Sequence, residues 1–237
     1  MEAFLRKRAL VFYWIILLIH CILQHYHSTF VAVTKPFLLP LLILYLFLRD
    51  DNIGSPLPKF IFYIGLFLAF FGDVLLILIN DTFFLSGMIA FMLMNLAYSI
   101  SFFMINPLQV KKFLPALVTF LLIGFLGYYF FDFLKDELGD YAMPIIVYMI
   151  TLSVMAVAAV NMVISQDYSG AAIKYLVPGA LVFIIENILV ALNKFHWNTN
   201  KDIFVIVMIT YAIAQYLMVR GIESIFLTNR AAGKTAV

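Results

Sequence analysis

Residues 84–104 read FLSGMIAFMLMNLAYSISFFM and contain no Asp, Glu, Lys or Arg. A helix of this length extends about 30 Å, which matches the hydrocarbon core of a bilayer. The rest of the chain has the same character, because 65% of its 237 residues are hydrophobic and only 12% are charged. A soluble fold of this size could not bury so much apolar surface. The sequence therefore predicts an integral multi-pass membrane protein.

About eight stretches are long and apolar enough to form a membrane-spanning helix. They are residues 9–24, 30–48, 59–79, 84–104, 112–131, 142–164, 172–193 and 203–227. The longest connections between them are residues 49–58, 132–141, 165–171 and 194–202. These connections leave no room for a soluble domain. We therefore expect an all-α bundle of about eight transmembrane helices, forming a single domain over residues 1–237.

Basic residues at the N-terminus indicate how the chain is oriented. Arg6, Lys7 and Arg8 precede the first apolar stretch, as in a secretory signal, but no small-residue cleavage site follows, so we expect a retained first span. With the N-terminus in the cytoplasm, eleven of the fifteen Lys and Arg fall on that side of an eight-span chain. They are Arg6, Lys7, Arg8, Arg49, Lys59, Lys111, Lys112, Lys174, Arg220, Arg230 and Lys234. This asymmetry predicts that both termini are cytoplasmic.

Several classes of protein are excluded or disfavoured. The net charge of +2 and the scattered basic residues do not predict a nucleic-acid partner. A single cysteine, Cys21, excludes an intrachain disulfide framework and a cysteine metal cluster. His20, His25 and His27 could in principle bind a metal, but an interfacial loop is the simpler interpretation. No G-x-S-x-G motif occurs, and we place no histidine among the buried polar residues, so we expect neither an acyl-transfer triad nor a metal or cofactor.

The two halves of the chain, residues 9–104 and 112–227, also resemble each other. Residues 65–76 align with residues 179–190, and each segment has a polar residue eight positions after a glycine. A parallel repeat of four helices would produce this pattern, and internal repeats are common in transporters. Apolar sequences also match by chance, so an internal repeat and a chance resemblance both remain open as interpretations.

Polar residues inside the predicted spans are the candidates for function. Lys35, Asp73 and Glu186 are ionisable, and such groups in a membrane usually face a bundle interior or a cavity. Amides and phenols accompany them: Asn95, Tyr98, Tyr148, Asn187, Tyr211 and Gln215. Lys35, Tyr148, Asp73 and Glu186 all lie about 9–10 Å below one surface. A cavity open toward the non-cytoplasmic side would produce this polar layer.

Each candidate also has a structural interpretation. Lys35 could extend its ammonium to the headgroups, and Asp73 and Glu186 could form buried contacts that only hold helices together. The amides and tyrosines could be hydrogen bonds between helices. Two carboxyls near an ammonium, however, would have different protonation states in a low dielectric. A neutral acid beside a carboxylate base can cleave an acid-labile ether by adding water.

Short motifs in a fixed order give the chain a resemblance to a known family. They are TKP at 34–36, GDVLL at 72–76, FLSGMIAF at 84–91, NLAY at 95–98, GALVF at 179–183 and YAIAQ at 211–215. In this set the sequence resembles the YhhN family of lysoplasmalogenase-like membrane proteins. The resemblance implies an eight-span enzyme that hydrolyses the vinyl ether bond of lysoplasmalogens. Its products would be a fatty aldehyde and a glycerophospho-ethanolamine or glycerophospho-choline.

The resemblance also implies which residues are functional. Asp73 matches the catalytic aspartate of the family's Gly-Asp motif. The second catalytic aspartate belongs to a Ser-Asp pair, where this chain has Glu186 and Asn187, and a histidine common in the fourth span is Asn95. Glu186 is therefore the candidate for the second carboxyl. The candidate substrate-binding residues are Lys35, Asn95, Tyr98, Tyr148, Asn187, Tyr211 and Gln215.

These departures leave two alternatives to a hydrolase. A divergent relative could bind a lysophospholipid or another single-chain amphiphile without cleaving it. The chain could also be a small secondary transporter, for which an internal repeat and polar residues at mid-membrane are typical signs.

Overall fold

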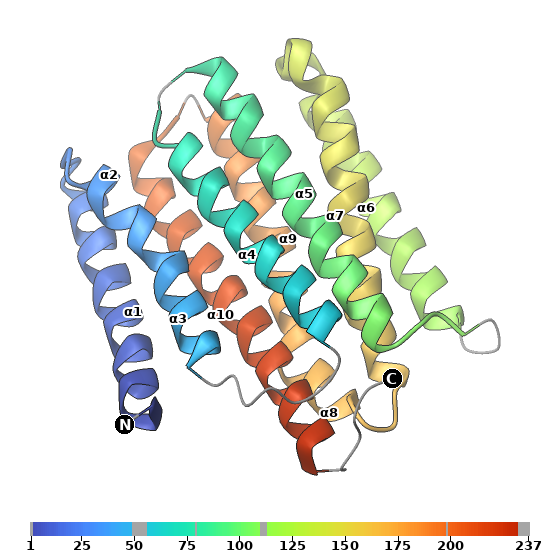
Figure 1. Ribbon diagram of the computed structural model, residues 1–237. Coiled ribbons are helices and arrows are strands. Elements are labelled where there is room, and N and C mark those ends of the chain that lie inside the picture. The colour runs from blue at the N-terminus through green and yellow to red at the C-terminus, as the bar shows by residue number, and fades with distance from the viewer. Residues whose placement is uncertain (1, 49–55, 79, 110–112, 198, 232–237) are drawn as a thin grey trace.

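The computed structural model describes residues 2–48, 56–78, 80–109, 113–197 and 199–231, which form an all-helical bundle (Figure 1). This confirms the predicted all-α fold class. The long helices are α1 (Glu2–His25), α4 (Pro56–Leu75), α5 (Asp81–Ile105), α6 (Leu114–Leu138), α7 (Ala142–Asn161), α9 (Val177–Ala191) and α10 (Lys201–Ala231). The shorter elements are α2 (Val31–Thr34), η1 (Lys35–Phe37), α3 (Leu38–Phe47), η3 (Gly139–Tyr141), η4 (Met162–Ile164), α8 (Ser169–Ala171), η5 (Ala172–Leu176) and η6 (Leu192–His196).

Six helical segments in the described part of the chain are long and apolar enough to cross a membrane, and they are compatible with a multi-pass membrane protein. One of the six, Leu114–Ile164, contains both α6 and α7, which pack against each other. The segment Val31–Phe47 is apolar but shorter. The count of eight crossings, the internal repeat and the single domain over residues 1–237 stay predictions.

The turn between α6 and α7 is much shorter than predicted. Residues 132–141 were expected to be a connection, but α6 continues to Leu138. The charges in this stretch lie on an exposed helical turn, where the Lys135 ammonium lies 2.7 Å from the Asp132 carboxylate three residues earlier. The chain then turns at Gly139, whose φ of +50° favours glycine. The charged residues of the predicted connection therefore belong to the solvated end of α6 and not to a loop.

Proline breaks the regular helix where Lys35 lies. The predicted span 30–48 forms α2, the 3-10 turn η1 and α3 in succession. Pro36 lacks a backbone N–H and cannot complete the helical hydrogen-bond pattern, so the chain tightens into a 3-10 turn at Lys35–Phe37. This turn carries Lys35 into the bundle.

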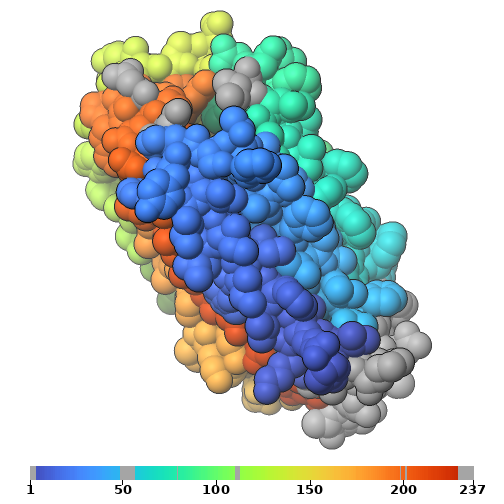
Figure 2. Space-filling model, turned by 90° about the vertical axis from the view of Figure 1, so that its left-hand side faces the viewer, coloured from blue at the N-terminus to red at the C-terminus, as the bar shows by residue number. Residues whose placement is uncertain are grey.

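The first and last helices meet at one end of the bundle. The Arg6 guanidinium, near the start of α1, lies 2.8 Å from the Glu223 carboxylate, near the end of α10. We call this the inner end, and the opposite end, where α5 begins, the outer end. Figure 2 shows α1 and the Val31–Phe47 segment covering one face of the bundle, with α10 beside α1. Membrane sidedness stays a prediction; of its basic residues, Arg49, Lys111, Lys112 and Lys234 lie outside the described part of the chain.

Glycines bring α4 and α5 into close contact. A Cβ added to Gly65 would lie 2.5 Å from the Tyr98 ring, and one added to Gly72 would lie 2.8 Å from the Phe91 ring. Both distances are shorter than a carbon contact allows, so a larger residue would force the helices apart. The close approach places Asp73, which follows Gly72, against the rings of α5 and α10.

Candidate functional site

Three predicted site residues meet in a buried cluster, which we call the carboxylate cluster. Lys35 Nζ of η1 lies 3.3 Å from Asp73 Oδ1 of α4. The Tyr211 hydroxyl of α10 donates a hydrogen bond of 2.7 Å to Asp73 Oδ2. Asp73 and Tyr211 are buried, and the Lys35 side chain is 15% exposed. Lys35 therefore pairs with Asp73 inside the bundle and does not extend to the surface.

A cavity of about 270 Å³ lies beside this cluster. Its walls come from Leu76, which follows α4, and from α5, α6, α7, α9 and η6, and most of the side chains that line it are apolar. Four polar residues line it: Tyr148, Glu186 and Asn187 near the middle of its length, and Ser153 further along α7 toward the inner end. Such a cavity accommodates a hydrocarbon group and brings a small number of polar atoms to one point along it.

Glu186 links the cavity to the carboxylate cluster. Its side chain is buried and lines the cavity, and its charge interacts with those of Lys35 and Asp73. It makes no hydrogen bond or ion pair with another described residue. On an isolated helix Glu186 and Asn187 point about 100° apart, yet both reach this cavity because its wall is broad along α9.

Asp73 is not among the residues that line the cavity. Phe91 lines it, and the Phe91 ring meets the Tyr211 ring edge to face at 5.9 Å between centroids. Phe91 also packs on Gly72, the neighbour of Asp73. Phe91 therefore lines the cavity and also contacts Gly72 and Tyr211, the two neighbours of Asp73.

Tyr148 and Asn187 line the polar side of the cavity, and Asn95 adjoins Tyr148 without lining the cavity itself. The Tyr148 hydroxyl is close to the side chains of both asparagines. Asn187 Nδ2 donates to the Phe183 carbonyl of its own helix at 2.8 Å. Asn95 is buried, and neither its side-chain nitrogen nor its oxygen makes a hydrogen bond of good geometry with a described residue. Unused hydrogen-bonding capacity therefore lies next to Tyr148, behind the lining of the cavity.

The remaining predicted pair, Tyr98 and Gln215, is separate from the cavity. The Tyr98 hydroxyl donates to Gln215 Oε1 at 2.8 Å, and Gln215 Nε2 contacts Met94 Sδ at 3.3 Å. Tyr98 also stacks on Phe62 at 4.5 Å between ring centroids. Both residues are fully buried and neither lines the cavity. This geometry is that of a hydrogen bond between α5 and α10.

The interpretation of His20 as part of an interfacial loop is wrong. His20 belongs to α1 and is 1% exposed, and its Nδ1 lies 2.8 Å from the Thr34 hydroxyl. Thr34 precedes Lys35, so a histidine adjoins the carboxylate cluster where we expected none. Its other nitrogen, Nε2, is buried without a described partner. The sequence signal was a histidine inside an apolar stretch.

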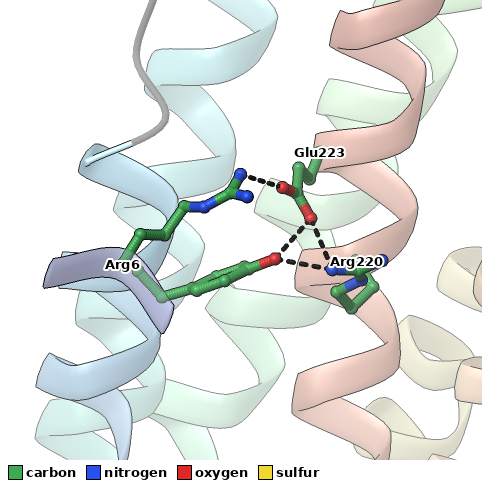
Figure 3. A network of polar contacts seen from close by, with 4 residues as sticks. Arg6, Arg220 and Glu223 are labelled. Atoms are coloured by element: carbon green, nitrogen blue, oxygen red, sulfur yellow. Dashed lines mark hydrogen bonds and ion pairs between the residues drawn. The ribbon is translucent and has the colours of Figure 1, made fainter. Parts of the chain in front are cut away.

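A second polar network lies at the inner end and was missed by sequence reasoning (Figure 3). Glu223 is 3% exposed, and its carboxylate contacts Arg6 at 2.8 Å and Arg220 at 3.2 Å. The Tyr45 hydroxyl donates to Glu223 Oε2 at 2.7 Å and accepts from Arg220 at 2.7 Å. Buried ionisable groups are therefore not confined to Lys35, Asp73 and Glu186. The two charges in the last turns of the 203–227 stretch belong to the bundle and not to a loop.

The arrangement favours acid and base chemistry on an amphiphile. One carboxyl is paired with an ammonium and a hydroxyl, and a second carboxyl faces an apolar cavity without a partner. In the part of the chain that the structure describes, no three His, Cys, Asp or Glu side chains gather as metal ligands would.

Comparison with known proteins gives one match. Residues 30–222 match the YhhN family, which is most of the chain and includes every candidate residue named above. No curated protein and no solved structure matches the chain. The chain therefore belongs to the YhhN family.

Proposed function

We propose that this protein is a membrane-embedded hydrolase that cleaves the vinyl ether bond of lysoplasmalogen-like lysophospholipids. The products are a fatty aldehyde and a glycerophospho-headgroup. Family membership is consistent with this activity. The observation that carries the proposal is the position of Glu186 in an apolar cavity beside the Asp73, Lys35 and Tyr211 cluster.

We assign the two carboxyls different protonation states because their partners differ. Relative to a buried carboxyl without partners, Asp73 is favoured as an anion by the Lys35 ammonium at 3.3 Å and the Tyr211 hydroxyl at 2.7 Å. A carboxyl in an apolar cavity without a partner is favoured in its neutral form, which describes Glu186. Glu186 is therefore the acid in this proposal and Asp73 is the base.

The reaction adds one water across the vinyl ether. Glu186 gives its proton to the vinyl carbon remote from oxygen, which leaves an oxocarbenium-like cation at the other vinyl carbon. Water adds to that carbon and loses a proton toward Asp73, forming a hemiacetal. The hemiacetal then breaks its carbon–oxygen bond: its hydroxyl proton returns to Glu186, and the glycerol oxygen takes the proton from Asp73. The two carboxyls share these steps as they do in glycoside hydrolysis.

The position of Phe91 sets a requirement on this scheme. Asp73 lies behind Phe91 and Tyr211, so water must reach the Tyr211 hydroxyl or the Asp73 carboxylate past the Phe91 ring. Tyr148 and Asn187 are positioned to orient the glycerol oxygens, and Asn95 offers unused hydrogen-bonding atoms beside them. Lys35 keeps Asp73 ionised. Tyr98 and Gln215 support the position of α10.

Purified protein and lysoplasmalogen test the proposal directly. Wild-type protein should release fatty aldehyde, and Asp73→Asn and Glu186→Gln should each abolish the release. Asp132→Asn is the matched control, because it removes an exposed carboxylate of α6 without touching the cavity. Absence of aldehyde from the wild type would exclude the hydrolase.

A second candidate function is lysolipid binding without hydrolysis. Asn187 and Asn95 replace the acidic residue and the histidine typical of the family; Asn187 lines the cavity, and Asn95 adjoins the lining residue Tyr148. Saturable binding of a lysolipid without aldehyde release would favour this function. Uptake of the lipid into proteoliposomes would instead favour a transporter.

A further inference from the structure

The cavity extends well beyond its polar groups. Along α9 and η6 its lining runs from Leu181 to Phe195, which is about 20 Å along the helix axis. Glu186 and Asn187 lie between these ends, so about 8 Å of apolar wall continues from Glu186 toward the inner end. This inner part contains one polar side chain, Ser153, whose hydroxyl donates to the Met149 carbonyl of its own helix at 2.7 Å, and no charged group that would recognise a headgroup. It is suited to a hydrocarbon chain.

The inner part of the cavity opens on the side of the bundle. Leu122 and Leu126 of α6 line the cavity and are 57% and 59% exposed. Leu181 of α9 also lines it and is 56% exposed. A side chain that faces both the cavity and the exterior lies at an opening. Because these helices are apolar enough to span a membrane, the exterior at this depth is lipid.

The packing of α6 explains where the opening lies. Leu134 and Leu138, near the outer end, are buried, and His196 Nδ1 lies 2.9 Å from Glu137 Oε1. These contacts join α6 to η6 at the outer end. Further in, none of residues 117–133 is buried, and α6 packs on α7. The helix formed by α9 and η6 is therefore joined to α6 at the outer end and separated from α6 along the inner part of the cavity.

Aromatic rings narrow the outer end of the cavity. Phe84 and Phe195 line it, and together with Tyr141 they form three ring contacts with centroids 5.4 to 6.3 Å apart. Lys194 lies over Phe84 and pairs with Asp81 at 3.2 Å. The outer end therefore carries charged and aromatic groups, whereas the inner part contains no charged group. This distribution of groups favours an amphiphile bound with its polar end outward and its chain inward.

We propose that the space between α6 and α9 is a hydrocarbon-chain subsite that opens into the bilayer, so that the chain of the bound lipid leaves the protein past Leu122, Leu126 and Leu181. This inference rests on the proposed function for the identity of the amphiphile as a lysophospholipid. The cavity volume of about 270 Å³ is at the small end of ligand sites, so it holds one chain and not two. An aldehyde product, which is apolar, can pass directly into the bilayer by this route.

A subsite that opens into the bilayer accepts chains of different lengths, because a long chain can continue beyond the opening. Binding of a short-chain and a long-chain ligand therefore tests the proposal. The ligands are saturated alkyl ether lysophospholipids, which have no vinyl ether to cleave, with a hexyl or a hexadecyl chain. The hexyl chain ends near the opening and the hexadecyl chain continues beyond it. Binding is measured with purified protein in lipid nanodiscs.

Leu126→Trp combined with Leu181→Trp should narrow the opening. We expect the affinity for the hexadecyl ligand to fall at least about tenfold because the long chain is then forced against the indoles. The affinity for the hexyl ligand should stay unchanged. The matched control is Leu121→Trp combined with Ile185→Trp, which adds the same bulk at exposed positions of α6 and α9 that do not line the cavity. Both ligands should bind the control as they bind the wild type.

The subsite would be overturned if the double variant lost equal affinity for the two ligands, or if it lost no affinity for the hexadecyl ligand. If the double variant does not fold, Leu181→Trp alone narrows the opening from one side and should reduce hexadecyl binding selectively. A hexadecyl ligand with a diazirine midway along its chain should label α6 or α9, and labelling of other helices instead would also overturn the subsite. These readouts are independent of catalysis. If the wild type releases aldehyde but the Trp variant loses no affinity for the hexadecyl ligand selectively, only the subsite is excluded. If the Trp variant loses that affinity selectively but the wild type releases no aldehyde, only the hydrolase is excluded.

Discussion

Asp73 and Glu223 are both buried carboxylates that accept a 2.7 Å hydrogen bond from a tyrosine hydroxyl. Glu223 has two guanidinium partners, Arg6 and Arg220, and its two oxygens contact residues of α1, α3 and α10. Asp73 has a single ammonium partner, Lys35, at a longer distance of 3.3 Å. The inner carboxylate therefore has the larger number of charged contacts.

Their surroundings differ more than their partners do. The inner network ties three helices together (Figure 3). None of Arg6, Tyr45, Arg220 or Glu223 lines the cavity. Asp73 lies behind Phe91 at the cavity wall, and its charge interacts with that of Glu186. Burial of a charge is thus common to both regions, and only proximity to the cavity separates a candidate catalytic group from a structural one.

The largest expected effect is the loss of catalysis in Asp73→Asn. Removal of a general base typically lowers a rate by about 10²- to 10⁴-fold, so aldehyde release should fall by this factor. The variant also leaves the Lys35 ammonium buried without its partner, which lowers stability. Lys35→Met in the same chain removes that unpaired charge, so stability should recover while activity does not. Activity regained in the double variant would show that Asp73 has only a structural role.

The complementary expectation is a large loss of stability in Glu223→Gln. The substitution leaves Arg6 and Arg220 without a counter-charge, and breaking a buried ion pair from one side costs about 3–5 kcal/mol. Thermal unfolding in detergent measures the loss. Aldehyde release per folded molecule should match that of the wild type. A catalytic loss as deep as that of Asp73→Asn, at an equal folded fraction, would mean that the inner network is coupled to the reaction.

The two tyrosines provide a smaller and closer comparison. Tyr211→Phe removes the hydrogen bond to Asp73, and a bond to a charged group contributes about 1.5–3 kcal/mol, so aldehyde release should fall by about tenfold or more. Tyr45→Phe removes the corresponding bond to Glu223, which should lower stability by a similar free energy and leave activity unchanged. Both variants need both measurements. Equal effects on activity would remove the distinction between the regions.

The sequence predicted the fold because a bilayer imposes a simple constraint. Every long apolar run must satisfy its own backbone, so the predicted stretches form helices. The boundaries were harder to predict, since a charged segment at a helix end, such as Asp132–Lys135, looks the same whether it continues the helix or ends it. Pro36 was visible in the sequence, but its effect, a 3-10 turn that aims Lys35 at Asp73, depends on packing.

The sequence predicted which residues are candidates for the site, but it did not predict which of them lie together. Ionisable residues in apolar runs identified Lys35, Asp73 and Glu186, because such residues are costly in lipid. A depth argument could not show that Tyr98 pairs with Gln215 away from the cavity, since depth gives one coordinate and not the direction around the helix. The same limit concealed His20, which is buried because α2 folds back on α1. Glu223 was overlooked because it lies near a predicted span end.

The smallest expected effect concerns a third carboxylate, Glu137, which pairs with His196 at the outer end. Both side chains are more than a third exposed, so water screens the pair and Glu137→Gln should change stability by less than about 1 kcal/mol. Asp132→Asn, in another exposed pair of the same helix, is the control and should behave alike. Measured together with Glu223→Gln, the series compares ion pairs of similar length that differ in burial. If Glu137→Gln were as destabilising as Glu223→Gln, burial would not be what gives the inner network its strength. The contrast between the two buried regions would then have to rest on catalysis alone.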